Sequence, residues 1–405
     1  MAITTEKAPG ETKVRPFTVK FPKSDVDDLR ARLAATRFPE KEPVADISQG
    51  VQLATMEALV RYWGSEYDFG RLEERLSALP QFITEIDGLD IHFIHVRSPH
   101  ENALPLLMIH GWPGSFVEFL NVIGPLSDPT AHGGRAEDAF DVVVPSIPGY
   151  GFSGKPDVPG WGPDHIARAF DELMRRLGYD QYAAQGGDWG AIIADIMGVQ
   201  APSGLLGIHS NMPGILPPEI NSLFGPARAD APPSDLSKEE RRTYDQVSVV
   251  YTKGIGYGVE MAMRPQTLYG IADSPAGLAS WILDHDAQSY EDISRAFIGG
   301  SPVGNLTRDE VLDNITLTWL TNTGVSSARL YHESPYNFFD VKGVSVPVAV
   351  TVFPRELYQA PRSWTQRAYS NLIYFREVDR GNHFAAWQEP QLFTEEVRAG
   401  LRSLR

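Results

Sequence analysis

The segment Gln185-Gly186-Gly187-Asp188-Trp189-Gly190 stands between an apolar run typical of a buried strand, residues 181–185, and a helical pattern over residues 189–199. Small residues two positions before and two after a central side chain are what a nucleophile elbow requires. Such a strained turn lifts the central side chain above a sheet and points a helix N-terminus at it. Asp188 holds the central position, where Ser is usual, and no Gly-x-Ser-x-Gly occurs in the sequence. The alternative interpretation is a glycine-rich turn in which Asp188 only caps the helix.

On both sides of this turn, strand-like and helix-like patterns alternate. Short apolar runs predict strands, and apolar residues at helical spacing predict helices. The expected strands are residues 104–109, 140–144, 181–185, 205–209, 346–352 and 373–378, and the expected helices are 166–177, 189–199 and 389–404. This alternation predicts an α/β fold with a mostly parallel central sheet and helices on both faces.

Two other stretches depart from the alternation and define the expected domains. Residues 211–339 are mainly helical, which predicts a cap inserted over the carboxyl ends of the strands, between core segments 99–210 and 340–405. Residues 1–98 form an N-terminal extension that we expect to pack on the core. It holds expected helices 24–36, 51–65 and 69–79, then strands 82–86 and 89–96 joined by the turn Asp87-Gly88.

Three further segments follow predicted strands and carry polar side chains. The loop from His110 to Ser115 occupies the position of an oxyanion loop, and Glu356 and His383 come after two later strands. The order Asp188, Glu356, His383 is the nucleophile, acid, base order of α/β-hydrolases. Asp313 is a rival for the acid, but it lies within the helical insertion rather than after a core strand. Each segment alone is compatible with an ordinary turn, whereas all of them in this order favour a catalytic triad.

Over nearly its whole length the chain resembles the microsomal type of epoxide hydrolase, a family with the α/β-hydrolase fold and an N-terminal extension. The segments that match the family are spread along the chain: residues 32–33, 36–39, 62–63, 67–68, 80–82, 91–95, 110–115, 148–153, 185–190, 264–267, 273–278, 326–331 and 383–387. The resemblance implies an enzyme that converts an epoxide to a vicinal diol through a covalent ester.

The resemblance also implies a role for each matching residue. The implied roles are Asp188 as nucleophile, His383 as general base, Glu356 as the acid that orients it, Tyr257 and Tyr331 as phenols that activate the epoxide oxygen, and the backbone N–H groups of Trp112 and Trp189 as oxyanion donors. Tyr251, shortly upstream, is a rival for Tyr257. We also expect a substrate pocket lined by His110, Gly111, Pro113 and Phe152.

Composition excludes several other classes of function. The formal net charge of −16 argues against a nucleic-acid partner, and the absence of cysteine excludes disulfides, zinc–thiolate sites and thiol nucleophiles. No apolar run approaches the roughly 20 residues of a membrane span, and the first residues lack a signal-peptide core. We therefore expect a soluble, cytoplasmic protein of the microbial type, without the membrane anchor of the animal relatives.

Two patterns suggest a cofactor or a metal, but neither fits. Gly149-Tyr150-Gly151-Phe152-Ser153-Gly154 matches a dinucleotide motif, yet Pro156 follows it and no helix starts there. His92 and His95 point to opposite faces of their strand, and the other histidines, His285 among them, show no ligand spacing. We expect no metal and no cofactor.

Rival activities remain open, as does the substrate. A haloalkane dehalogenase also uses an Asp nucleophile, and Asp188-Trp189 is compatible with it. A non-catalytic binding member of the fold is a second alternative. For the epoxide reading, the expected substrate is an aryl or bulky epoxide, in detoxification, aromatic hydrocarbon catabolism or natural-product assembly such as that of enediynes. The resemblance further implies a homodimer.

Overall fold

A central sheet organises the chain. The computed structural model describes residues 13–405, so residues 1–12 of the expected extension lie outside the described part. Within that part a nine-stranded sheet has the order β1-β2-β3-β5-β4-β6-β7-β10-β11. Its strands are β1 (Arg15–Pro16), β2 (Gln81–Ile86), β3 (Leu89–Val96), β4 (Leu104–Ile109), β5 (Phe140–Pro145), β6 (Tyr182–Gly186), β7 (Leu205–Ser210), β10 (Val348–Val352) and β11 (Leu372–Glu377).

The direction of the strands brings the expected site loops to one edge. Strands β5, β4, β6, β7, β10 and β11 run parallel, whereas β1, β2 and β3 pair antiparallel. This confirms the predicted α/β fold with a mostly parallel sheet. Since the carboxyl ends of parallel strands share one edge, the loops after β4, β6, β10 and β11 meet there.

Helices cover both faces of the sheet, as predicted. Helices α5 (Pro163–Arg176) and α6 (Trp189–Gln200) lie on one face, and α4 (Leu120–Ser127) and α17 (Pro390–Leu401) on the other. Along β4, Leu107 and Ile109 belong to one buried cluster and Leu106 and Met108 to the other. Each fully buried side chain of this kind contributes about 2 kcal/mol. The apolar run that predicted β4 thus reflects a strand buried on both faces.

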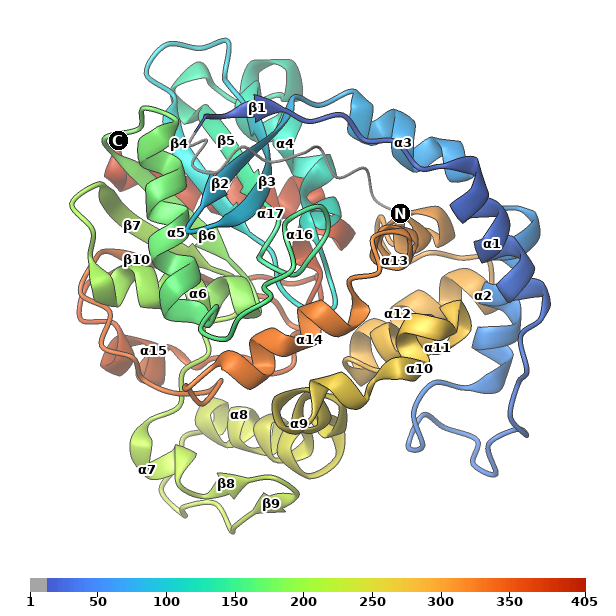
Figure 1. The fold of residues 1–405 in the computed structure, drawn as a ribbon. Helices are drawn as coiled ribbons and strands as arrows, with labels where there is room; N and C mark the ends of the chain where they lie inside the picture. Colours follow the sequence, from blue (N-terminus) through green and yellow to red (C-terminus); the bar gives the residue numbers. More distant parts are fainter. Residues whose placement is uncertain (1–12) are drawn as a thin grey trace.

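The segment between β7 and β10, which includes the residues 211–339 expected to form the cap, is mainly helical. In Figure 1 its yellow and orange helices form a layer of their own beside the sheet. They are α7 (Pro218–Asn221), α8 (Lys238–Val249), α9 (Gly256–Met263), α10 (Tyr269–Asp273), α11 (Pro275–Leu283), α12 (Ala287–Ile298), α13 (Arg308–Leu320) and α14 (Gly324–Glu333). A short two-stranded ribbon, β8 (Phe224–Gly225) with β9 (Arg228–Ala229), completes it.

The N-terminal stretch contributes to two parts of the fold. Its strands β1 to β3 belong to the central sheet, while helices α1 (Lys23–Ala34) and α2 (Leu53–Ser65) contact cap helix α11, and α2 also contacts α12. The extension expected for residues 1–98 therefore reaches the cap as well as the core. Among residues 13–405, no helix is both long and apolar enough to cross a bilayer.

A buried ion cluster ties the N-terminal stretch to the cap. The Asp313 carboxylate on α13 has no exposed side-chain surface and accepts hydrogen bonds from the Tyr67 hydroxyl at 2.7 Å and from the Arg71 and Arg75 guanidinium groups on α3 (Phe69–Ser77). Glu310, one turn earlier on α13, pairs with the same two arginines. Asp313, the rival for the triad acid, thus serves in this cluster.

We predict that Asp313→Asn lowers the free energy of unfolding by about 3 kcal/mol, because it leaves two half-buried arginines with a single carboxylate. Urea denaturation measures the loss. Asp309→Asn is the matched control: Asp309 accepts the Tyr62 hydroxyl at 2.7 Å in a less buried position, and its replacement should cost below about 1 kcal/mol. An equal loss of unfolding free energy in the two variants would contradict the conclusion that the buried ion cluster stabilises the fold.

Candidate active site

Asp188 lies at the strained turn between β6 and α6. Its φ of 52° is in the left-handed region, which non-glycine residues rarely adopt. A Cβ added at Gly186 would lie 2.1 Å from the carbonyl oxygen of Gly190, and one added at Gly190 would lie 1.9 Å from that of Ile109. Only glycine therefore fits two positions before and two after Asp188, which is the elbow that the sequence predicted.

The loop after β4 holds one oxygen of the Asp188 carboxylate. The backbone N–H of Trp112 donates to Asp188 Oδ1 at 2.7 Å. A Cβ on Gly111 would lie 2.4 Å from Asp188 Cβ, so the absence of a side chain there allows the loop to come this close. Trp189 is the first residue of α6, where backbone N–H groups have no partner within the helix. The expected donor of Trp112 thus binds the Asp188 carboxylate, and the expected donor of Trp189 lies at the free N-terminus of α6.

His383 and Glu356 form a buried pair beside Asp188. The Nδ1 atom of His383 lies 2.7 Å from Glu356 Oε1, and its Nε2 atom lies 3.9 Å from Asp188 Oδ2. A parallel bridge between Arg355 and Asn382 aligns the loops that carry the two residues. The structure therefore brings together the three side chains that the sequence singled out.

The surroundings of His383 favour its charged form. Burial opposes protonation, but the negative charges of Glu356 and Asp188, together with the hydrogen bond to Glu356, raise the pKa of His383 to about 10. The site at neutral pH therefore contains an imidazolium between two carboxylates.

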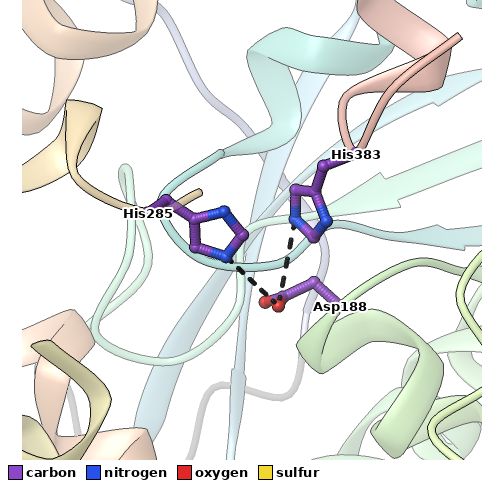
Figure 2. A group of neighbouring side chains, drawn as sticks. All are labelled: Asp188, His285 and His383. Carbon is purple, nitrogen blue, oxygen red and sulfur yellow. Dashed lines mark ion pairs between the residues drawn. The ribbon is translucent and has the colours of Figure 1, made fainter. Parts of the chain in front are cut away.

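His285 is a second histidine beside Asp188, and the sequence did not indicate it. It lies in the cap between α11 and α12, and Figure 2 shows its ring and that of His383 both directed at Asp188. Its Nε2 atom is 3.9 Å from Asp188 Oδ2, and the two imidazole centroids are 4.3 Å apart. The expectation that His285 joins no cluster is wrong, because the folding of the cap onto the core brings distant residues together. In the local sequence, the one feature that could have indicated a role for His285 was the adjacent carboxylate of Asp286.

Within the described residues, Asp188, His285 and His383 also form a group whose ligand atoms are close enough together to bind a metal ion. The ligand atoms of Asp188, His285 and His383 lie within 4.8 Å of one another. Both histidines have a carboxylate partner at Nδ1, which is common for metal-binding histidines and equally for catalytic ones. The geometry therefore suits either an ion or a water molecule between the two Nε2 atoms.

Two cap tyrosines lie close to Asp188. The ring of Tyr257 on α9 stacks on Trp112 at 4.8 Å, and the ring of Tyr331 on α14 meets Trp189 edge-on at the same centroid distance. Burial and nearby negative charge, that of Asp188 included, raise the pKa of each phenol well above its usual value, so both keep their protons. Tyr251, the rival, stacks on Phe224 at 5.4 Å instead.

The expected pocket residues are divided between the site and the core. His110 and Gly111 line a cavity of about 20 Å³ together with Asp188 and His383, which is room for about one water molecule. Pro113 lines a smaller cavity of about 10 Å³ beneath the cap. Phe152 lines neither of these two cavities, so the expectation that it lines the substrate pocket is corrected. It packs among the rings of Phe17, Phe21, His92 and Phe116, since the turn after Gly151 directs it away from the site.

Two polar groups of the site were not singled out from the sequence. The Glu118 carboxyl lines the larger cavity, and burial raises its pKa to about 8. The Tyr150 hydroxyl is buried with no hydrogen-bond partner among the described residues, and its ring centroid lies 5.2 Å from that of His110. Tyr150 lies in a segment that carried the family resemblance, whereas nothing local distinguished Glu118.

Comparison with known proteins identifies the family. Residues 14–119 match the family described as "Epoxide hydrolase N terminus", and residues 105–268 match "alpha/beta hydrolase fold". A relative from Stigmatella aurantiaca, provisionally named an epoxide hydrolase, is 49% identical over 97% of this chain and 86% of its own. The chain belongs to the epoxide hydrolases.

More distant epoxide hydrolases agree with this assignment. Epoxide hydrolase 1 of Sus scrofa is 34% identical over 96% of this chain and 88% of its own. The crystal structure of juvenile hormone epoxide hydrolase from the silkworm Bombyx mori matches with a TM-score of 0.83 and 30% identity, over 98% of this chain and 95% of that one. The family resemblance, the fold and the enzyme class expected from the sequence are thus confirmed.

We predict that Glu356→Gln lowers stability in a pH-dependent way. Because the pKa of His383 is raised from 6.5 to about 10, the folded enzyme holds a proton that the unfolded chain releases. Stability from this proton is fully present below about pH 6.5 and is lost as the pH rises through about 10. The loss in unfolding free energy caused by Glu356→Gln should therefore shrink across this window in urea titrations. Glu137→Gln, at an exposed carboxylate, is the control whose effect stays constant with pH. A flat Glu356→Gln effect would refute the charged pair.

Proposed function

We propose that this epoxide hydrolase opens its substrate through a covalent ester on Asp188 and then hydrolyses that ester to release a vicinal diol. One observation carries the proposal: Asp188 Oδ1 is held by Trp112, while Oδ2 is directed at His383 with two tyrosines above it. One oxygen is thus fixed and the other is available to attack.

In the first step Asp188 Oδ2 attacks an epoxide carbon, and the bond from that carbon to the ring oxygen breaks. Tyr257 and Tyr331 donate hydrogen bonds to the ring oxygen, and one of the two phenols gives its proton to the leaving alkoxide, which becomes a hydroxyl. The proton of the His383 imidazolium then restores that phenol, which leaves His383 neutral for the second step. The raised pKa values of Tyr257 and Tyr331 keep both phenols protonated until the alkoxide charge develops. The cap therefore supplies the groups for ring opening.

In the second step His383 takes a proton from water, which attacks the carbonyl carbon of the ester. Formation of the ester removes the Asp188 charge, one of the charges that raise the pKa of His383, and so favours the neutral base. The N–H groups of Trp112 and Trp189 stabilise the oxyanion. Collapse releases the diol, and the oxygen from water stays in the Asp188 carboxyl.

The substrate class that we propose is an aryl or other bulky epoxide, because Trp112, Trp189, Tyr257 and Tyr331 surround the nucleophile with rings. The tyrosine pair favours an epoxide over an alkyl halide. Assays with alkyl halides test the dehalogenase alternative, since halide release would support it. A panel of terminal, styrene-type and polycyclic epoxides, with chiral analysis of the diols, tests the substrate class.

We predict that a single turnover in ¹⁸O water places the label in the Asp188 carboxyl, as peptide mass spectrometry of the wild type detects. His383→Gln should form the ester and retain it, because capture needs Asp188 and hydrolysis needs the base. Asp188→Asn is the control that forms no ester. Label appearing only in the diol would refute the covalent route, and substrate binding without an adduct in His383→Gln would refute the role of His383.

We predict that Tyr257→Phe combined with Tyr331→Phe lowers the rate of ester formation by at least about a hundredfold, because the alkoxide loses both donors. Stopped-flow fluorescence measures this rate. Tyr251→Phe is the matched control, since Tyr251 stacks on Phe224 away from the nucleophile, and its rate should stay unchanged. Ester formation at the wild-type rate in the double variant would exclude the two phenols.

A further inference from the structure

His285 has an unused nitrogen at the centre of the site. It is 3% exposed, and its Nε2 atom is buried with no hydrogen-bond partner among the described residues. A buried imidazole nitrogen of this kind carries a desolvation cost unless a ligand or water meets it. That nitrogen faces Asp188 Oδ2 at 3.9 Å (Figure 2). The mechanism above assigns it no role.

Asp286 fixes the orientation of this imidazole. Asp286 Oδ2 lies 3.0 Å from His285 Nδ1, and its Oδ1 accepts the backbone N–H of Ser289 at 2.7 Å at the start of α12. Burial opposes ionisation of Asp286, but the hydrogen bond from His285 and nearby positive charge hold the pKa of Asp286 below its usual value. When this carboxylate accepts Nδ1–H, the ring is oriented so that Nε2 points into the site.

The His285–Asp286 pair has the same arrangement as the His383–Glu356 pair. Glu356 Oε1 accepts the backbone N–H of Leu357 at 2.8 Å while it holds His383 Nδ1. In each pair a carboxylate fixed by a backbone N–H orients one imidazole, and both Nε2 atoms lie 3.9 Å from Asp188 Oδ2. Two acceptors of equal geometry therefore flank the oxygen that becomes the ester.

One water molecule can reach both nitrogens. One ligand atom from each of Asp188, His285 and His383 lies within 4.8 Å of the others, and both Nε2 atoms are 3.9 Å from Asp188 Oδ2. Since a hydrogen bond spans about 2.8 Å, a water between the two rings is in reach of each nitrogen. Such a water donates one hydrogen to each nitrogen, which leaves its lone pairs for the ester carbon. With His383 alone, rotation about a single hydrogen bond would leave the direction of attack undefined.

We propose that His285, held by Asp286, is the second acceptor for the water that hydrolyses the Asp188 ester. This inference rests on the proposed covalent mechanism. In the step, one O–H bond of water breaks and its proton moves to His383 Nε2, while the second hydrogen stays bonded to oxygen and is accepted by His285 Nε2. The oxygen forms a bond to Asp188 Cγ, and the carbonyl electrons move to the oxygen held by the oxyanion donors.

The test separates the two half-reactions with styrene oxide as the probe, in wild type, His285→Phe and His285→Gln. Stopped-flow fluorescence gives the rate of ester formation, and mass spectrometry of quenched protein gives the fraction esterified. In His285→Phe we expect ester formation within about threefold of wild type, hydrolysis slower by about tenfold or more, and accumulated ester. His285→Gln, which keeps an acceptor, should recover part of the hydrolysis rate.

His100→Gln is the matched control for replacing a histidine that pairs with a carboxylate. His100 Nε2 lies 3.0 Å from Asp128 Oδ1, and neither residue lines the cavities around Asp188. Both rates should equal those of wild type. A normal burst of ester formation in His285→Phe also shows that the variant is folded, so a structural effect does not imitate the expected result.

Three results for the His285→Phe variant would overturn the inference. They are unchanged hydrolysis in His285→Phe, an equal fall of both rates, and a selective fall of ester formation, which would assign His285 to ring opening. Loss of wild-type activity in EDTA with recovery in zinc would also overturn it, because the two nitrogens would then hold an ion. Absence of ester in wild type would overturn the covalent mechanism and the inference with it, a result distinct from the other four.

Discussion

The close backbone contact between the start of α6 and the end of β4 is the constraint on which the site depends. Gly190 lies against Ile109 so tightly that no side chain fits, and Gly186 leaves space for the same helix turn. This contact holds Asp188 in its left-handed conformation and brings the Trp112 N–H onto one carboxylate oxygen. The strain of the turn is thus offset by packing over the whole strand–helix unit, and the fold itself fixes the orientation of the Asp188 carboxylate.

Charge balance is the second constraint. Asp188, Glu356 and the Asp286 side chain are almost entirely buried, and uncompensated carboxylates in such a place would be costly. A protonated His383 lies between Asp188 and Glu356 and offsets their charge, while Asp286 has His285 as its hydrogen-bond partner. In the mechanism that we propose, ester formation at Asp188 removes one of these charges, and His383 then changes from a stabilising cation into a base. Under this proposal the same charges serve stability in the resting enzyme and catalysis once the ester has formed.

The core of the fold and much of the site could be predicted from the sequence. The run 104–109 is the strand β4 because it is buried on both faces, and the glycines around Asp188 predicted the turn because only they fit it. The order of Asp188, Glu356 and His383 was informative because the fold brings the carboxyl ends of its strands together. These features depend on local chain geometry or on the order of the strands, and both can be read from the sequence.

The sequence by itself determined the nucleophile turn, the alternation that makes the sheet, and the residues that follow each strand. Tertiary structure decided which cap groups reach the nucleophile: it brought Tyr257 rather than Tyr251 over Asp188, added His285, and turned Phe152 into the core. It also joined α3 to the cap through Asp313. The physical reason is that the packing of a helical insertion on a sheet depends on contacts between distant residues, which no local period or motif encodes.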